Sequence, residues 1–473
     1  MKKRFSSLKE IQKSISESGI TLPELVQYYL DQIESNKHLN AFLEVFNDEA
    51  LEMASQIQSK ISNGSAGKLA GMVIAIKDNI VYKDHESNAS SKILKGFKSL
   101  FSATVVERLI AEDAIIIGRT NCDEFAMGAS NENSAFGPVL NALDPTRVPG
   151  GSSGGSAVAV QADMCLASLG SDTGGSIRQP AAFTGIYGIY PTYGAISRWG
   201  LIAFASSFDQ IGPFTSSPDD MALRLNVISG SDEHDATMHQ GPALNIQLNS
   251  EQKPLKIAYI NDCLEHPGLE PEIKQATEQF INTLKSKGHT VEGISFPHLD
   301  QMVPCYQVLT TAEASSNLSR FSGLTYGYRS ENAHDLESTF KKSRSEGFGP
   351  EVKRRIMLGT FVLTSDFYDA YYTKAQKVRR LIRNKTMDIF NTYDIILTPT
   401  TSTVAFKLGE KASNPIAMYL ADLFTVQSNL AGIPALSIPF GTHPGNQMPI
   451  GMQIMGRPME EALLLNLAAS LEA

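Results

Sequence analysis

The stretch SLGSDTGGSIRQPAAFT, residues 168–184, places Ser176 directly after two glycines and contains no histidine. A serine hydroxyl attacks a carbonyl carbon only when a neighbouring base activates it. None of the nine histidines of the chain lies inside the glycine- and serine-rich region around this stretch. A Ser-His-Asp arrangement therefore has no obvious base here, and another residue type must supply one.

Lys77 is the candidate base, because it ends the apolar run MVIAIK at 72–77, which predicts a buried strand. A lysine accepts a proton only when it is neutral. Neutrality near pH 7 costs roughly 4 kcal/mol from a reference pKa of about 10.4, and burial supplies pKa shifts of about 3–5 units. Asp78 would oppose this shift. Successive strand residues point to opposite faces, however, so its side chain need not reach the amine.

A second loop, PGGSSGGSA at 149–157, supplies Ser152. Active sites of parallel-sheet enzymes lie at the carboxyl ends of the strands. The helix that follows this loop runs antiparallel to the next strand, so the loops at 150–155 and 171–176 should face each other. We therefore expect Lys77, Ser152 and Ser176 at one rim. Neither loop fits the phosphate-binding patterns GxxxxGK[ST] or GxGxxG, which argues against a nucleotide site.

The TGGS segment has a second predicted role. Glycines let consecutive backbone N–H groups converge on one point, here those of Thr173, Gly174, Gly175 and Ser176. Such a group of donors stabilises a developing oxyanion, and one donor is worth about 3–4 kcal/mol. We interpret Asp172 and Arg178, which flank the segment, as a hydrogen-bonded or ionic brace.

Strands and helices alternate along much of the chain, which predicts an α/β fold with a large, mixed, mostly parallel sheet covered by helices on both faces. A capping box at Thr21 and Glu24 opens an amphipathic helix. The other predicted helices lie at 48–62, 104–112, 156–164 and about 271–287, and the predicted strands at 72–77, 114–118, 165–170, 255–260, 290–296, 395–399, 435–440 and 450–456.

The segment at about 300–392 is mainly helical and charged in its pattern, and strand character returns after it. A late return of strands indicates one large fold with a helical insertion. We therefore predict a single domain over residues 1–473.

Composition limits the class of protein. The 473 residues are 42% apolar, and the net charge of −9 argues against a stand-alone nucleic-acid binder. The cysteines, Cys122, Cys165, Cys263 and Cys305, match no metal-ligand spacing and are expected to be reduced thiols. No secretory signal and no apolar run of membrane-spanning length is found, so we expect a soluble cytoplasmic protein without membrane contact.

GGSSGGSA, followed 24 residues on by SDTGGSIRQP and preceded by IAIKDNI, resembles the amidase signature family. The resemblance implies the amidase-signature fold and a Ser–Ser–Lys triad. Ser176 corresponds to the nucleophile, Ser152 to the bridging serine and Lys77 to the base. It further implies that the peptide bond between Gly151 and Ser152 is cis.

Within that family the chain resembles the glutaminase subunits of tRNA-dependent amidotransferases over nearly its whole length. The segments that carry this resemblance are VERLIAEDAIIIGRTNCDEFAMG, YGAISRWGLIAFASSFDQIGPFT, VKRRIMLGTF and DLFTVQSNLAGIPALSIPFG. It implies an enzyme that forms a γ-glutamyl ester on Ser176 and releases ammonia from glutamine. The ammonia then converts Glu-tRNA(Gln), or Asp-tRNA(Asn), to the amidated form.

The same resemblance implies partners and cofactors. The partners are the B and C subunits of the amidotransferase, and tRNA is contacted mainly through the complex. ATP and Mg are used by the partner subunit, and no metal or cofactor is expected in this chain. Two positions depart from the usual pattern, Tyr190 and Ala195, and these departures could alter the rim where a partner or substrate docks.

Glutamine needs a cation for its carboxylate and an anion for its ammonium. The resemblance implies Arg355 for the first, with Arg354 adjacent, and Asp422 for the second. It also implies Tyr306 as a hydrogen-bond donor and the backbone around Met127 and Gly128 as pocket lining. Two alternatives stay open at this point: a free-standing amidase of small carboxamides, which has little need for such a clamp, and a non-catalytic assembly module.

Overall fold

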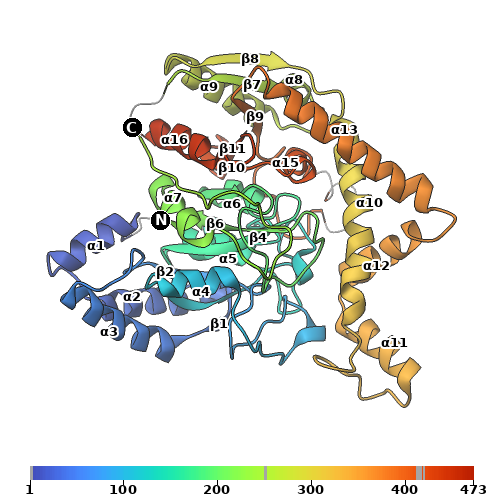
Figure 1. Cartoon of the computed structure of the whole chain (residues 1–473), viewed down its shortest axis with the longest axis horizontal. Coiled ribbons are helices and arrows are strands. Elements are labelled where there is room, and N and C mark those ends of the chain that lie inside the picture. Colours follow the sequence, from blue (N-terminus) through green and yellow to red (C-terminus); the bar gives the residue numbers. More distant parts are fainter. Residues whose placement is uncertain (1–3, 250–252, 412–417, 419–420, 473) are drawn as a thin grey trace.

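Eleven strands form one sheet in the part of the chain that the structure, a computed structural model, describes: residues 4–249, 253–411, 418 and 421–472. The strand order is β1-β3-β2-β4-β6-β5-β10-β11-β9-β7-β8 (Figure 1). The strands are β1 (Phe42–Val45), β2 (Val73–Lys77), β3 (Ile115–Thr120), β4 (Ala167–Asp172), β5 (Tyr187–Tyr190), β6 (Gln210–Thr215), β7 (Lys256–Ile260), β8 (Thr290–Ile294), β9 (Ile395–Pro399), β10 (Ala435–Thr442) and β11 (Pro449–Met455).

The predicted α/β fold and the mixed sheet are confirmed, but the predicted parallel majority is wrong. Among the described strands four neighbouring pairs are parallel and six are antiparallel. The sequence analysis missed β1, β5 and β6, each of which pairs antiparallel with its neighbours. Glycine or proline interrupts YGIY and QIGPFT, and such residues weaken the apolar run that signals a strand.

The parallel pairs that matter for the site are β2–β3 and β2–β4. Ile76 lies opposite Leu169, so β2 and β4 end close together at one edge of the sheet. This edge carries Lys77 and the start of the TGGS segment, as the strand-end argument requires.

The helices agree with the predicted positions to within a few residues. Thr21 and Glu24 form the predicted capping box at the start of α2. The α-helices outside the 299–389 segment are α1 (Leu8–Ser16), α2 (Leu22–Ser35), α3 (Asn47–Asn63), α4 (Thr104–Ala111), α5 (Gly154–Gln161), α6 (Arg178–Thr184), α7 (Pro218–Ile228), α8 (Asn261–Leu264), α9 (Pro271–Ser286), α15 (Val426–Ala431) and α16 (Glu461–Glu472).

Helices flank the sheet in two groups. Helices α5 and α6 contact each other and the central strands, and all eight residues of α5 are buried. Its small residues, GGSAVAVQ, allow this close approach. Helices α4, α7 and α16 form the second group, in which α7 contacts both of the others. The two glycine-rich loops therefore lie where α5 and α6 begin.

A helical segment lies between β8 and β9, close to the predicted insertion at 300–392. It contains α10 (Leu299–Asn317), α11 (Leu336–Gly347), α12 (Pro350–Val362), the π-helical turn η5 (Tyr368–Thr373) and α13 (Lys374–Ile389). Figure 1 shows these helices along one side of the molecule, next to α15. No helix of the described residues is long and apolar enough to cross a membrane.

Candidate active site

Lys77 is the last residue of β2, and its side chain is fully buried. Its Nζ lies 2.7 Å from Ser152 Oγ, 2.8 Å from Ser153 Oγ and 2.9 Å from Ser171 Oγ. Burial lowers the pKa of Lys77 to about 8, although nearby acidic groups, including Asp123, favour its charged form. Burial therefore favours the neutral amine, the form that can accept a proton.

Asp78 lies away from this amine, as the strand alternation predicts. Its carboxylate pairs with Arg119 and accepts the backbone N–H groups of Asn88 and Ser90 at 3.0 and 2.6 Å. Desolvation still raises the pKa of Asp78, against the opposing charge of Arg119. The neighbouring carboxylate is thus compensated on its own side of the strand.

The loops that carry Ser152 and Ser176 face each other. The N–H of Ser153 donates to the carbonyl of Ser176 at 3.2 Å, and the Gly151–Ser152 peptide bond is cis, as predicted. Lys77 and Ser152 are fully buried, whereas Ser176 is 8% exposed. The hydroxyl of Ser176 makes no hydrogen bond to the described residues, and this serine is the most exposed of the three.

The predicted group of oxyanion donors needs one correction. Gly175 N–H already donates to Asp172 Oδ1 at 2.8 Å, because the segment curls back over that carboxylate. Among the described residues no acceptor meets the N–H groups of Thr173, Gly174 or Ser176. These three remain candidates for holding an oxyanion. Gly175 instead shapes the turn, with a φ of +136° that a side chain would strain.

The brace interpretation of Asp172 and Arg178 is confirmed. Both side chains are fully buried and meet through two contacts of 3.0 Å. Arg178 also donates to the Thr425 carbonyl at 2.7 Å and to Gln453 Oε1 at 2.7 Å. Burial opposes ionisation of Asp172, but Arg178 and the other donors hold its pKa below the usual value. The ion pair and these two hydrogen bonds fix the TGGS segment to the segments of α15 and β11.

Tyr306 of α10 packs directly on the TGGS segment. A Cβ at Gly174 would lie 2.6 Å from the Tyr306 hydroxyl oxygen, so only glycine leaves room for this ring. Burial, followed by the charge of Asp422, raises the pKa of Tyr306, which keeps the phenol protonated as a donor. The structure thus places this predicted substrate-binding residue beside the nucleophile loop.

Asp422 and Arg355 also lie in this region. Burial raises the pKa of Asp422 to about 8, and the positive charge of Arg355 opposes that rise. Thr425 Oγ1 donates to the carbonyl of Gly174 at 2.5 Å and to that of Asp422 at 3.0 Å, which joins the two segments. Arg355 is 5% exposed, and its Nε donates to Glu351 Oε1 at 2.8 Å. Arg354, the alternative, is the more exposed of the two and also pairs with Glu351.

Met127 and Gly128 follow the short turn η3 (Glu124–Ala126). Met127 is fully buried, and its carbonyl accepts from Asn133 Nδ2 at 3.3 Å. A Cβ at Gly128 would lie 2.3 Å from the Asp123 carboxyl carbon, so the backbone here passes close to that carboxylate. Asp123 N–H in turn donates to the carbonyl of Ser152 at 3.1 Å, which ties this segment to the catalytic loops.

Three polar residues around Lys77 were missed by the sequence analysis. Ser153, Ser171 and Asn79 were given no role in the chemistry predicted from the sequence. Asn79 Nδ2 donates to Ser171 Oγ at 2.9 Å, and Ser153 Oγ donates to the carbonyl of Ser171 at 3.0 Å. The available signal was the shared edge of β2 and β4, since polar residues at the end of one strand meet those at the end of its neighbour.

Metal ligation has no support in the described residues, which contain no group of three or more histidine, cysteine, aspartate or glutamate side chains that could hold an ion. All four cysteines are buried.

Comparison with known sequences points to one family. The family model described as Amidase matches residues 24–465. The chain is 46% identical over 471 residues to the A-type subunit of glutamyl-tRNA(Gln) amidotransferase from Ruminiclostridium cellulolyticum, covering 99% of this chain and 96% of that protein. It is 48% identical over 468 residues to the protein of the same description from a Sulfurihydrogenibium species, covering 98% and 96%.

Comparison with solved structures agrees. The crystal structure of the A-type subunit of glutamyl-tRNA(Gln) amidotransferase from Thermotoga maritima matches with a TM-score of 0.78 at 39% identity, over 95% of this chain and 90% of that one. These matches span the sheet, both glycine-rich loops and the helical segment. With its lysine and serines arranged as described above, the chain belongs to the amidase signature family.

Proposed function

We propose that this chain is the glutaminase subunit of a tRNA-dependent amidotransferase, which supplies ammonia for the conversion of Glu-tRNA(Gln) to Gln-tRNA(Gln). Full-length identity of 46–48% to subunits of that description supports the assignment. The observation that carries the chemistry is the buried amine of Lys77, bonded to Ser152 beside the Ser176 loop.

The hydrogen bonds around Lys77 set the direction of proton transfer. Ser153 gives its only proton to the Ser171 carbonyl, so its oxygen can only accept from Lys77. Ser171 Oγ already accepts from Asn79. The hydroxyl of Ser152 has no other hydrogen-bond partner among the described residues, so it can donate to the neutral amine. Its oxygen is then available to accept the proton of Ser176.

The reaction follows from this order. Lys77 draws the proton of Ser152, Ser152 draws that of Ser176, and Ser176 Oγ attacks the side-chain amide carbon of glutamine. The oxyanion is held by backbone N–H groups of the TGGS segment. Lys77 and Ser152 return the proton to the amide nitrogen, the C–N bond breaks and ammonia leaves. Water then adds to the γ-glutamyl ester by the same relay, releasing glutamate and restoring the Ser176 hydroxyl.

Glutamine is held at its other end by charge. Arg355 takes the α-carboxylate, Asp422 takes the ammonium and the hydroxyl of Tyr306 donates a hydrogen bond, while the backbone at Met127 and Gly128 lines the pocket. The ammonium of the substrate favours the carboxylate form of Asp422 and offsets the burial that raises its pKa. A site with both charges selects a free amino acid over a simple carboxamide.

The remaining assignments follow from this function. The chain works with the B and C subunits, and tRNA is contacted mainly through that complex in the cytoplasm. The partner uses ATP and Mg to activate the acceptor carboxylate, and the chain described here needs no cofactor of its own.

The assembled amidotransferase, purified with its partner subunits, tests the proposal by a glutaminase assay with and without charged tRNA. We expect glutamate and ammonia from glutamine, and amidated tRNA when ATP is present. Hydrolysis of simple carboxamides with no use of glutamine would instead identify a free-standing amidase.

A further inference from the structure

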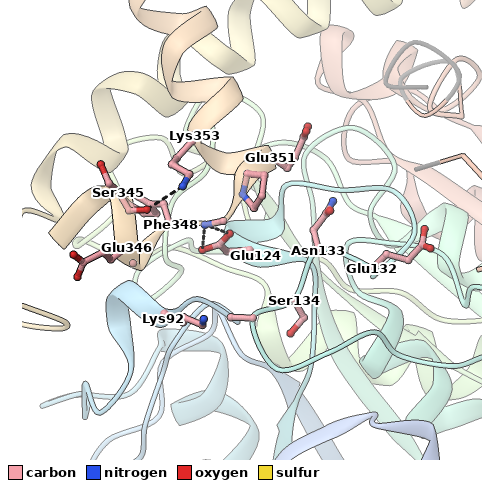
Figure 2. Close-up of a pocket in the computed structure, with 14 residues that line it drawn as sticks. Lys92, Glu124, Glu132, Asn133, Ser134, Ser345, Glu346, Phe348, Glu351 and Lys353 are labelled. Carbon is pink, nitrogen blue, oxygen red and sulfur yellow. Dashed lines mark hydrogen bonds between the residues drawn. The ribbon is translucent and has the colours of Figure 1, made fainter. Parts of the chain in front are cut away.

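Glu124, next to Asp123, has a buried carboxyl group to which neither the proposed triad nor the proposed glutamine clamp assigns a role. It begins η3 and is 2% exposed. Its two oxygens accept the backbone N–H of Gly349 at 3.1 and 2.9 Å, and Ser91 Oγ also donates to it. Figure 2 shows this carboxylate joined by dashed lines to the backbone at the start of α12.

Gly349 is the N-cap residue of α12, and it has no side chain to cap the helix. Helix N-termini present unpaired N–H groups and a partial positive charge, which a carboxylate stabilises. A Cβ at Gly349 would lie 2.3 Å from Glu124 Oε2, so the carboxylate occupies the space of the missing side chain. Glu124 is therefore the cap of a helix far away in the sequence.

Helix α12 carries Arg355 near its start. Glu351, in the first turn, accepts from Arg355 Nε at 2.8 Å. The position of the guanidinium thus depends on two carboxylates: Glu351 holds the side chain, and Glu124 holds the turn from which Glu351 projects.

The other side of Glu124 leads to the catalytic loops. Met127 N–H donates to the Glu124 carbonyl at 3.0 Å, and Asp123 N–H donates to the carbonyl of Ser152 at 3.1 Å. The ring of Phe125 packs against that of Phe348, with centroids 5.6 Å apart. The segment from Asp123 to Met127 therefore connects Ser152 to the beginning of α12.

We propose that Glu124 is a positioning residue for glutamine, because its carboxylate holds α12 and Arg355 at a fixed place relative to Met127 and Gly128. This inference rests on the proposed function. Glu124 acts through Arg355 and does not touch the substrate. Its loss is expected to weaken glutamine binding and to leave the serine chemistry intact.

Glu124 lines a pocket of about 450 Å³ (Figure 2). Burial raises the pKa of Glu124 to about 7, while Ser91, Gly349, Lys353 and Lys92 favour the charged form. The other charged groups that line the pocket are Glu132, Glu346 and Glu351. The ionised carboxylate is the stronger cap, so the KM for glutamine should fall as pH rises through about 7.

The test compares Glu124→Gln with wild type in the assembled amidotransferase. We expect the KM for glutamine to rise about tenfold and its fall between pH 6 and 8 to become flatter, with kcat within about twofold. Ser91→Ala, which removes only one donor to the carboxylate, should raise KM about threefold. Transamidation with ammonium chloride in place of glutamine should be unchanged for both variants.

Glu132→Gln is the matched control, because Glu132 lines the same pocket but its Oε1 accepts from Gly409 N–H, outside α12. It should leave KM unchanged. Normal KM in both Glu124→Gln and Ser91→Ala overturns the inference, and so does an equal loss of glutamine- and ammonia-dependent rates, which marks a purely structural role. A wild-type complex that hydrolyses no glutamine overturns the proposed function and this inference together, whereas an active wild type tests Glu124 alone.

Discussion

The edge of the sheet that carries Lys77 and the helices that carry Arg355 and Tyr306 are built in different ways. Lys77, Ser152 and Ser176 lie within about 100 residues of one another: Lys77 ends β2, and the two serines lie on loops that join buried strands and helices. The lysine amine is held by three hydroxyl groups. The chemical centre is therefore rigid and belongs to the core of the fold.

The proposed glutamine clamp is assembled from segments spread between residues 127 and 422. Tyr306 and Arg355 come from helices of the 299–389 segment, whose outer turn η5 has no buried residue. Single contacts join these segments to the centre: Tyr306 packs on Gly174, and Thr425 lies between Gly174 and Asp422. In the proposed mechanism, this fold therefore separates bond cleavage from substrate choice. Changes in the two regions should therefore affect different kinetic constants.

The largest effect is expected at the centre, from Ser176→Ala. Removal of the nucleophile should lower glutamine hydrolysis by roughly 10⁴–10⁶-fold, because the proposed ester forms on the Ser176 hydroxyl. Mass spectrometry of the complex with glutamine should find the γ-glutamyl adduct on wild type and none on the variant. An adduct that persists on the variant would assign the nucleophile to another residue.

Lys77→Ala comes next, and we expect roughly a 10³–10⁴-fold loss in kcat. The change removes the base and leaves Ser152, Ser153 and Ser171 without their shared donor. Steady-state glutaminase kinetics measure this effect, and ammonia-dependent transamidation serves as the control for assembly. Turnover close to wild type would mean that another base acts, and the Ser152 relay would be wrong.

Asp422→Asn tests the other region and should raise the KM for glutamine about a hundredfold with a much smaller change in kcat. The variant keeps the size of the side chain but cannot bind the substrate ammonium as an anion. Initial rates over a range of glutamine concentrations separate the two constants. If glutamine- and ammonia-dependent rates fell equally, Asp422 would have a structural role and the separation of the regions would not hold.

The pH dependence of kcat/KM for glutamine should reflect both regions. Lys77 must be neutral and Asp422 ionised, and burial brings both pKa values to about 8. Each active form is lost as pH falls, so kcat/KM should rise at least tenfold between pH 6.5 and 8.5. In Asp422→Asn the rise in kcat should persist, while the fall in KM should shrink to the part that depends on Glu124. A flat profile over this range would contradict both assignments.

The sequence reveals the centre more fully than the rest of the molecule, for physical reasons. Glycines, serines and a strand-end lysine at close spacing leave a local pattern, and so does the Asp172–Arg178 brace. The antiparallel strands β5 and β6 carry glycine or proline, so their local sequence pattern is weak. Ser171 and Glu124 act through contacts between distant segments, such as Glu124 with Gly349, which no local pattern contains.

The smallest effect is expected from Ser171→Ala, a rise in kcat of about three- to tenfold at neutral pH, where more of the Lys77 amine would be neutral. Lys77 keeps Ser152 and Ser153, but Asn79 Nδ2 loses its acceptor. Because Ser171 Oγ accepts from the charged amine, its loss disfavours that form, and the pKa seen in the kcat profile should move below its wild-type value.

Ser168→Ala is the matched control, since this buried serine on the same strand donates to the Ser156 carbonyl and not toward Lys77. An unshifted profile in Ser171→Ala, or an equal shift in Ser168→Ala, would show that the tuning of the lysine does not depend on this hydroxyl. A shift confined to Ser171→Ala would show that even the buried centre is tuned by a residue outside the triad.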